Sequence, residues 1–516
     1  MRSRRNALKW SILLVLGGVL CASGAWAESD CTVWASPLGS PAWSMSLDLH
    51  GSTPRGTSDR PIQIAEFWST AKPGDTLCLK DGIYTGAQSA IAPPEGLSGL
   101  PGAPITVRAE NDGGALIDGG LRGGAKANGK VPVRLRLNDH FVLEGFNVAY
   151  SHKAVISIAG RWAKEGAGNG LSRKDWDPIE HVTLRRIVAW DANPRFDDYH
   201  ECRLDPTCNL SRKAGWNANY HVIDVAAARD VLLEDVAAFG TGRKVFQVYL
   251  SERVTIRRAW GRWEGNAVTH TQTFSCAYRS YDSLCENVIG TWSGEQQDPA
   301  ISIRGQLKSI LGMDWFKATD QFQGRDPYDS GLRIFGSLAY LPADIELPPK
   351  TLVAVGYGKG QELRDIVAYA GEANSPLKTL ALTGCMKRVG CSWEKDEARD
   401  EAPLIATRLT SITDTGRISV DAAWSGIGGA PPVIDRRSPA DQAPNVWSGE
   451  GARLCHRYVD GVLTQQPLWP WPMNERIRLA TSYARGRATD VDAEVRGLLG
   501  PIPPACRVQG EPAPSS

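Results

Sequence analysis

The densest positive charge in the chain lies between residues 243 and 262, where six Lys or Arg residues accompany a single acidic residue, Glu252. Cations of this kind can neutralise the carboxylate of a uronate sugar, which makes the proton on the adjacent carbon more acidic. A base whose pKa is lowered by neighbouring cations could then remove that proton. The chemistry that these residues would support is β-elimination on an acidic polysaccharide.

The catalytic candidates within and beside this stretch are Lys244, Arg243, His221 and Tyr220. Parallel strands stack about 4.8 Å apart, so residues at equivalent positions of successive strands form columns. Two columns are predicted here: Ala154, His221, Lys244, Thr273; and Lys153, Tyr220, Arg243, Gln272. Neither contains a carboxylate that would neutralise Lys244. The alternative is a solvated Lys–Arg pair at a turn with no role in chemistry.

Five further residues are candidates for substrate binding: Lys153, Asp224, Gln247, Arg262 and His270. Asp224 is an outward-facing carboxylate in the predicted column Ser157, Asp224, Gln247, Cys276. His270 follows Trp260 and Trp263, whose rings could stack on sugars, although tryptophans in a Trp-rich chain more often cover core. No pair of carboxylates suited to glycoside hydrolysis is evident.

A long insertion over 191–219 offers the only candidate metal ligands. Asp197 and Asp198 could bind Ca²⁺, which takes several carboxylate oxygens. The alternative is an ordinary solvated loop, so the cofactor remains unknown and Ca²⁺ is one option.

Half of the basic stretch is predicted to be structural. One column reads Arg185, Glu234, Arg257, Glu286, and the next reads Arg186, Asp235, Arg258, Asn287. Charges that alternate at strand spacing form a salt ladder, which is ordinary sheet chemistry. We therefore expect Arg257 and Arg258 to stabilise the sheet.

These columns depend on an internal repeat of short alternating strands. The repeats at 142–146, 182–187, 231–236 and 254–259 share a charged or small residue at the same place, and 283–288 and 363–366 continue the series. The copies at 231 and 254 are 23 residues apart, which fits one coil of a β-solenoid. A second strand in each coil aligns residues 155–158, 222–225, 245–248 and 274–277.

Residues 72–84 and 104–120 resemble the opening of right-handed parallel β-helix proteins of the pectate-lyase-like superfamily, including chondroitinase- and alginate-lyase-like members. The resemblance implies an all-β, right-handed parallel β-helix with loop insertions. For the lyases of this fold it also implies a Lys or Arg base and a nearby Arg, Tyr or His as acid. A short helix over 489–499 predicts a small C-terminal cap over the terminal coil.

The expected organisation is a signal peptide over 1–27, an N-terminal segment over 28–60, the β-helix over 61–455, and a C-terminal cap and tail over 456–516. The first segment has a basic start, an apolar stretch and the cleavage site Ala25-Trp26-Ala27. Removing it takes away four positive charges and leaves a formal net charge of −3. We therefore expect no nucleic-acid partner, no membrane span and a periplasmic or secreted location.

Cysteine usage agrees with export. Ten cysteines remain after Cys21 is removed, an even number that predicts five disulfides in an oxidising compartment. Three close pairs are predicted to bond: Cys202 with Cys208, Cys276 with Cys285, and Cys385 with Cys391. The connectivity of the remaining four stays open, and these are Cys31, Cys78, Cys455 and Cys506.

Three function classes follow. The first is a polysaccharide lyase acting by β-elimination on a uronate-containing polysaccharide. The alternatives are a non-catalytic glycan-binding or surface protein and a β-helix glycoside hydrolase. The expected partner is a polysaccharide, acidic if the basic candidates contact it.

Overall fold

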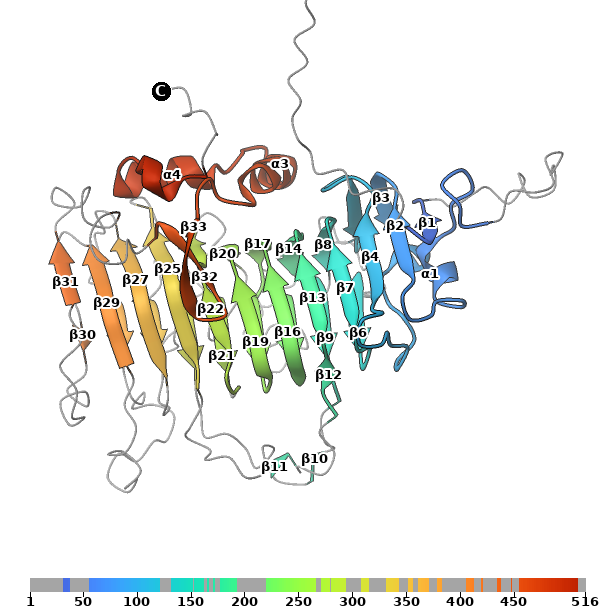
Figure 1. The fold of residues 1–516 in the computed structure, drawn as a ribbon, viewed down its shortest axis with the longest axis horizontal. Coiled ribbons are helices and arrows are strands. Elements are labelled where there is room, and N and C mark those ends of the chain that lie inside the picture. Colours follow the sequence, from blue (N-terminus) through green and yellow to red (C-terminus); the bar gives the residue numbers. More distant parts are fainter. Residues whose placement is uncertain are drawn as a thin grey trace, which may run out of the picture.

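The structure, a computed structural model, is a right-handed parallel β-helix, as the sequence predicts (Figure 1). Most coils contribute three strands, one to each face of a long rod, and the strands of each face pair in parallel from coil to coil. The structure describes residues 31–37, 55–120, 131–151, 153–161, 165–166, 170–171, 177–192, 220–265, 271–278, 280–293, 308–314, 331–342, 351–355, 361–370, 378–382, 405–412, 419–420, 434–437, 447 and 454–508.

The first face lies toward the viewer in Figure 1. Its strands are β1 (Val33–Ala35), β2 (Thr76–Leu79), β4 (Ile105–Ala109), β7 (Phe141–Glu144), β12 (Ile179–Glu180), β13 (Val182–Arg185), β16 (Ala228–Glu234), β19 (Glu252–Arg257) and β22 (Leu284–Glu286). Each repeat strand identified in the sequence up to residue 288 belongs to this face.

The second face adjoins the first. Its strands are β3 (Gly82–Thr85), β5 (Ala115–Asp118), β8 (Asn147–Ser151), β14 (Val188–Ala192), β17 (Ala237–Thr241), β20 (Trp260–Gly265) and β23 (Ile289–Trp292). In later coils, longer strands continue both faces, because β25 (Arg333–Leu341) pairs with β22 of the first face and β23 of the second. The strands after it are β27 (Glu362–Ala370), β29 (Ile405–Ile412) and β31 (Ile434–Arg437).

The third face is a separate nine-stranded sheet. Its strands are β6 (Val133–Arg136), β9 (Ile156–Ala159), β15 (His221–Ala226), β18 (Lys244–Tyr249), β21 (Thr271–Tyr278), β24 (Lys308–Asp314), β26 (Thr351–Val355), β28 (Lys378–Leu382) and β30 (Ser419–Val420). A small antiparallel pair, β10 (Glu165–Gly166) and β11 (Gly170–Leu171), lies apart from the three faces.

Inward-facing aliphatic and aromatic side chains of all three faces form one continuous core. The corner between the first two faces is a single residue in the left-handed conformation, such as Asp235 or Asn287. Such residues turn the chain at each coil without a loop, and Asp and Asn tolerate that conformation better than most residues. The strands on either side therefore keep their register from coil to coil.

The C-terminal segment covers the side of the rod. It consists of the hairpin β32 (His456–Val459) and β33 (Val462–Pro467), helices α3 (Asn474–Arg485) and α4 (Val491–Leu499), and a 3-10 turn at Pro504–Cys506. Its Trp469, Trp471 and Ile477 pack against Trp190 and Trp260 of the second face, among others. The helical cap predicted from the sequence exists, but it lies along the flank and not over the last coil (Figure 1).

The predicted α4 buries Val491, Val495 and Leu499, and the side chain of Asp490 caps its first turn by accepting from the Ala493 amide at 2.9 Å. Helix α3 was not predicted from the sequence. Near the N-terminus lies a helix of a single turn, α1 (Ile64–Phe67). No described helix is long and apolar enough to cross a bilayer.

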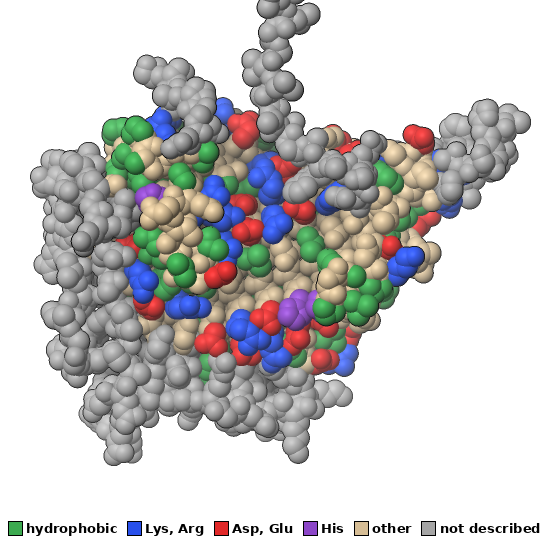
Figure 2. Space-filling view, viewed as in Figure 1, with side chains coloured by type: hydrophobic (Ala, Val, Ile, Leu, Met, Phe, Trp, Pro, Cys, Tyr) green, Lys and Arg blue, Asp and Glu red, His purple; other side chains and the backbone are tan. Residues whose placement is uncertain are grey.

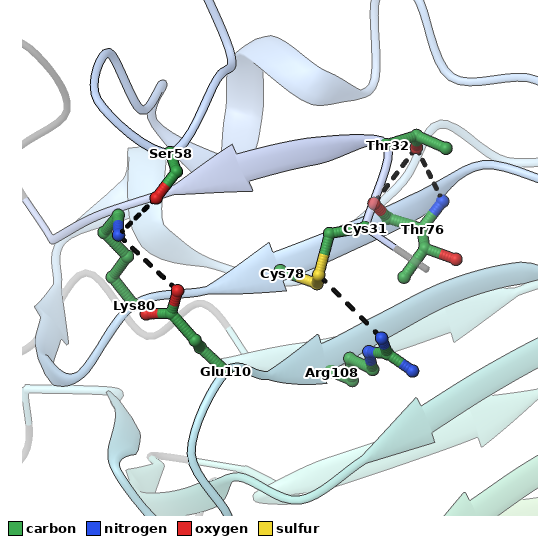
Figure 3. The surroundings of a disulfide bond; sticks show 8 residues. All are labelled: Cys31, Thr32, Ser58, Thr76, Cys78, Lys80, Arg108 and Glu110. Carbon is green, nitrogen blue, oxygen red and sulfur yellow. Dashed lines mark hydrogen bonds and ion pairs between the residues drawn. A yellow bond between two sulfur atoms is a disulfide. The ribbon is translucent and has the colours of Figure 1, made fainter. Parts of the chain in front are cut away.

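Three disulfides are present among the described residues: Cys31–Cys78, Cys276–Cys285 and Cys455–Cys506. Cys276–Cys285 confirms one predicted pair, and the other two settle a connectivity that the sequence left open. Figure 3 shows how Cys31–Cys78 joins β1 to β2, beside the ion pair of Lys80 with Glu110.

The other two predicted disulfides fall outside the part of the chain that the structure describes. The first is the bond of Cys202 with Cys208, and the second is the bond of Cys385 with Cys391. Five disulfides are predicted, and three are present among the described residues. The other two bonds stay predictions.

Candidate functional site

Two columns of polar residues cross the outer side of the third face. The first, here called the lysine column, runs through His221, Lys244, Gln272 and Ser309. The second, the aspartate column, runs through Ser157, Asp224, Gln247 and Ser275. Between them, Ile223, Phe246 and Phe274 belong to the core. The columns therefore form one polar layer over a hydrophobic floor, in which Ser157 and Asp224 are half-buried and the other members are buried.

Lys244 ties the two columns together. Its Nζ donates to Ser275 Oγ at 2.9 Å and lies 5.1 Å from the ring centroid of Tyr278. The residue is 2% exposed, so it is not the solvated turn lysine that was the alternative expectation. Burying an ammonium group is costly unless polar partners surround it. The fold thus holds Lys244 in a specific polar environment.

Asp224 is the acidic group of this surface. Burial raises the pKa of the Asp224 carboxyl to about 7, although Lys244 and Arg243 both act to lower it. The lysine column contains no carboxylate, as predicted, but the neighbouring column supplies one close enough to interact with both cations. A carboxyl that titrates near neutral pH is suited to proton transfer.

His221 is buried in the lysine column. Burial, followed by the charges of Lys244 and Arg243, holds the pKa of His221 well below its usual range. Its ring is therefore neutral at neutral pH. Its buried Nδ1 has no hydrogen-bond partner among the described residues.

Tyr220 and Arg243 lie at the start of β15 and β18 and are half-buried. The Arg243 amide donates to the Tyr220 carbonyl at 2.8 Å, which fixes the two residues side by side. Burial raises the pKa of the Tyr220 phenol, so it keeps its proton at neutral pH. The structure thus brings together all four catalytic candidates, with Asp224 beside them.

The register of β21 differs by one residue from the sequence-based alignment. Lys244 pairs with Gln272 and not Thr273, and Gln247 pairs with Ser275 and not Cys276. The rings of Phe246 and Phe274 stack at a centroid distance of 4.4 Å with a 5° interplanar angle. Because these two rings stack in the core, the register of β18 and β21 is fixed. That register determines which polar residues pair with each other in the two columns.

Gln272 is a site residue that the sequence analysis placed in the wrong column. Its Nε2 donates to Ser309 Oγ at 3.2 Å, while its buried Oε1 has no hydrogen-bond partner among the described residues. A Cβ at Gly312 would lie 1.9 Å from Gln272 Nε2. The absence of a side chain at Gly312 therefore makes room for the Gln272 amide.

The remaining binding candidates are dispersed. Gln247 is buried and donates to the Val248 carbonyl, and Lys153 is exposed before β9. Arg262 lies on the second face, where it contacts Glu264 and Thr489 beneath the C-terminal segment, so it is on a different face of the rod from Lys244. His270, Asp197 and Asp198 lie outside the described residues. Within the described part of the chain, no cluster of His, Cys, Asp or Glu could hold a metal ion.

The salt ladder is confirmed on the first face, where charges of both signs intermingle (Figure 2). Arg257 contacts Glu286 at 2.6 Å and Glu234 at 3.4 Å, and Arg258 contacts Asp235 at 2.7 Å. Arg257 also pairs with Asp460 of the C-terminal hairpin. Both arginines are engaged in the sheet, as expected for structural residues.

No protein-family model matches the sequence. No curated protein matches it either. Solved structures do resemble the fold. A pectate lyase, Pel9A, is 13% identical with a TM-score of 0.35 and covers 81% of this chain and 94% of its own. The chain itself folds as a parallel β-helix.

Two further structures illustrate the range of similar proteins. A rhamnogalacturonan lyase is 13% identical with a TM-score of 0.35, covering 88% of this chain and 99% of its own. A GH136 lacto-N-biosidase from Eubacterium ramulus is 10% identical with a TM-score of 0.40, covering 78% of this chain and 68% of its own. These low identities give no basis for an activity, which has to be argued from the residues of the site.

Proposed function

We propose that the protein is an extracytoplasmic enzyme that cleaves a uronate-containing polysaccharide by β-elimination on the outer side of the third face. The observation that supports this most is the placement of Asp224 close to two cations, Lys244 and Arg243, the second of which is joined to Tyr220 by a backbone hydrogen bond. These groups match the three requirements of the reaction: a cation, a base and an acid.

In the proposed mechanism, half-buried Arg243 binds the uronate carboxylate and stabilises the negative charge that develops on it. Asp224, in its ionised form, removes the proton from the adjacent carbon. The electron pair then forms a carbon–carbon double bond and expels the glycosidic oxygen, which takes a proton from Tyr220. Neutral His221 contributes no acid in this scheme.

The role of Lys244 changes in the light of its burial. A base has to reach the substrate, and Asp224 is more exposed than Lys244, which is buried. We therefore assign the base to Asp224 and give Lys244 the role of keeping a share of Asp224 ionised at neutral pH. Lys244 as the base is the competing assignment.

Hydrolysis is a weaker second candidate. It requires two carboxyl groups roughly 5–10 Å apart. Asp224 is the only acidic residue in β6, β9, β15, β18 and β21, and the next one on this face, Asp314 of β24, lies three strands from β15, about 14 Å away at normal strand spacing.

The deciding experiment incubates the purified protein with alginate, pectate and glycosaminoglycans. The expected result is ultraviolet absorbance from an unsaturated uronate product, lost in Asp224→Asn. New reducing ends without that absorbance would establish a hydrolase instead. Binding with neither product would establish a glycan-binding protein. The three disulfides support the location, since they persist in oxidising compartments.

A further inference from the structure

Two tyrosines form the next outward column on the third face. Tyr249 of β18 pairs with Tyr278 of β21, and their ring centroids are 5.1 Å apart. Both side chains are half-buried, whereas Gln247 and Ser275 of the aspartate column are buried. The column therefore combines two aromatic rings with partial access to solvent.

A bulge in the strand aims Tyr278 outward. The pairing of β18 with β21 shifts register between Gln247 and Tyr249, so that three residues of β21 match two of β18. Without this shift, Ala277 would face Tyr249. Bulges of this kind redirect a side chain and are frequent beside binding sites. The residue inside the bulge is Cys276, whose disulfide to Cys285 in β22 anchors the distortion.

The backbone at both tyrosines is held in the same way. Ser251 Oγ donates to the Tyr249 carbonyl at 2.9 Å, and Ser280 Oγ donates to the Tyr278 carbonyl at 3.1 Å. Both tyrosines thus belong to a Tyr-x-Ser motif, repeated 29 residues apart in successive coils. The bulge and the repeated motif together fix the two rings in place.

The tyrosines are adjacent to the proposed reaction centre. Tyr249 lies two residues beyond Gln247, which pairs with Asp224, so the Asp224 and Tyr249 backbones are roughly 8 Å apart at normal strand spacings. Side chains that start from backbones this close can contact neighbouring units of one polysaccharide chain. Lys244 Nζ, 5.1 Å from the Tyr278 ring centroid, connects the rings to the polar columns directly.

We propose that Tyr249 and Tyr278 form a carbohydrate-stacking subsite that binds the pyranose unit next to the uronate that reacts. The apolar C–H face of a pyranose packs on an aromatic ring, and a phenol adds a polar edge for the sugar hydroxyls. The inference rests on the proposed function, which places the reacting uronate at Asp224. It adds the requirement that the substrate carries a pyranose unit next to that uronate.

The test measures binding separately from turnover. Tyr249→Ala and Tyr278→Ala are prepared in the Asp224→Asn background. Calorimetry then gives the Kd for oligosaccharides without a double bond. They are made from whichever of alginate, pectate and the glycosaminoglycans the protein binds best. Each substitution is expected to weaken binding about tenfold for oligosaccharides of four or more units. Neither should affect a single uronic acid, which occupies only the reaction centre.

Two matched controls separate stacking from folding. Tyr278→Phe keeps the ring and is expected to bind within about twofold of its parent. Tyr483→Ala removes a half-exposed tyrosine from α3, on another face of the rod, and is expected to leave Kd unchanged. Melting temperatures of all variants confirm that they are folded.

Oligosaccharide binding that is unchanged in folded Tyr249→Ala and Tyr278→Ala would overturn the subsite, even if unsaturated products are formed. Conversely, a loss of binding in both variants supports the subsite even if no unsaturated product ever forms, in which case only the lyase assignment fails. Equal weakening of the single uronic acid and the longer oligosaccharides would also overturn the subsite, because the rings would then contact the reacting unit itself.

Discussion

At the scale of single residues, the site depends on a conflict between burial and charge at Asp224. Burial favours the neutral carboxyl, and the neighbouring cations favour the carboxylate. The balance puts the titration of this side chain close to neutral pH. A change to Asp224 or to either cation shifts that balance in a direction that can be stated in advance.

The pH dependence of kcat/KM reports this balance. Because the ionised form of Asp224 is the proposed base, activity is expected to rise with pH through about 7. Lys244→Ala removes a charge that lowers the pKa of Asp224, so the rising limb should move to higher pH, with at least about tenfold lower activity at pH 6.

Asp224→Asn should lower kcat by about 10²–10⁴-fold at every pH. If Lys244 is the base instead, Lys244→Ala will abolish activity at every pH, and no rise of kcat/KM will be seen at higher pH. That outcome would restore the competing assignment.

At the scale of strands, the fold was predictable because the sequence repeats at the coil spacing. The corner residues Arg186, Asp235, Arg258 and Asn287 align both in the sequence and in the structure. The site was less predictable. The bulge at Cys276 inserts a residue that no repeat reveals, so the sequence-based alignment, which is correct at Tyr278, is one residue out at Gln272 and Ser275.

Helix α3 was missed for a different reason. Its buried residues include Arg476 and Thr481 beside Ile477 and Ala480, so it lacks the apolar stripe that marks an amphipathic helix. The Tyr-x-Ser repeat of the tyrosine subsite, in contrast, was visible in the sequence. It could have been found by aligning the ends of the third-face strands.

The salt ladder should contribute measurably to stability. Arg257 contacts Glu286, which is fully buried, so Arg257→Ala would leave that carboxylate with the backbone amides of Asp460 and Gly461 as its described partners. We expect a loss of about 2–3 kcal/mol in the free energy of unfolding, with kcat unchanged. Urea denaturation provides the measurement. Arg478→Ala, which breaks an exposed pair with the acidic residue three positions before it, is the control and should cost under about 0.5 kcal/mol.

The Cys276–Cys285 disulfide should support both the bulge and stability. It closes a short loop of 9 residues in sequence separation, and Cys276→Ser with Cys285→Ser is expected to cost about 2–3 kcal/mol. Oligosaccharide binding should weaken as well, because Tyr278 lies two residues beyond the bridge. Denaturation and calorimetry on the same double variant test both effects, and intact binding would show that the bulge is stable without the bridge.

At the scale of the whole molecule, one buried and one half-buried arginine attach the C-terminal segment to the rod. Arg485 of α3 contacts Asp191 of β14 and Glu264 of β20, each at 2.7 Å. Arg476 pairs with Asp112 and donates to Asn147 Oδ1 at 2.7 Å. Apolar contacts with the second face add to these attachments.

Arg485→Ala should loosen this attachment. Burial already raises the pKa of Asp191, and Arg485 opposes that effect, so its removal leaves the Asp191 carboxylate buried without this cation. The expected loss is about 3–5 kcal/mol, accompanied by faster hydrogen exchange in α3 and α4. Arg487→Ala, an exposed neighbour, serves as the control. Unchanged exchange in α3 would show that the apolar contacts hold the segment alone.

The placement of the described disulfides has a mechanical consequence. Cys31–Cys78 closes the N-terminal end, and Cys455–Cys506 closes a loop within the C-terminal segment, so neither crosses the central coils. A chain pulled from its two termini would keep the 47-residue and 51-residue spans between these bonded cysteines closed. The stretch between them would unwind one coil at a time. Force spectroscopy should record a series of steps of unequal length, because one coil spans 23 residues between Val231 and Val254 and another spans 49 between Leu284 and Arg333. Reduction of the disulfides should lengthen the fully extended chain and also the central step that contains Cys276–Cys285.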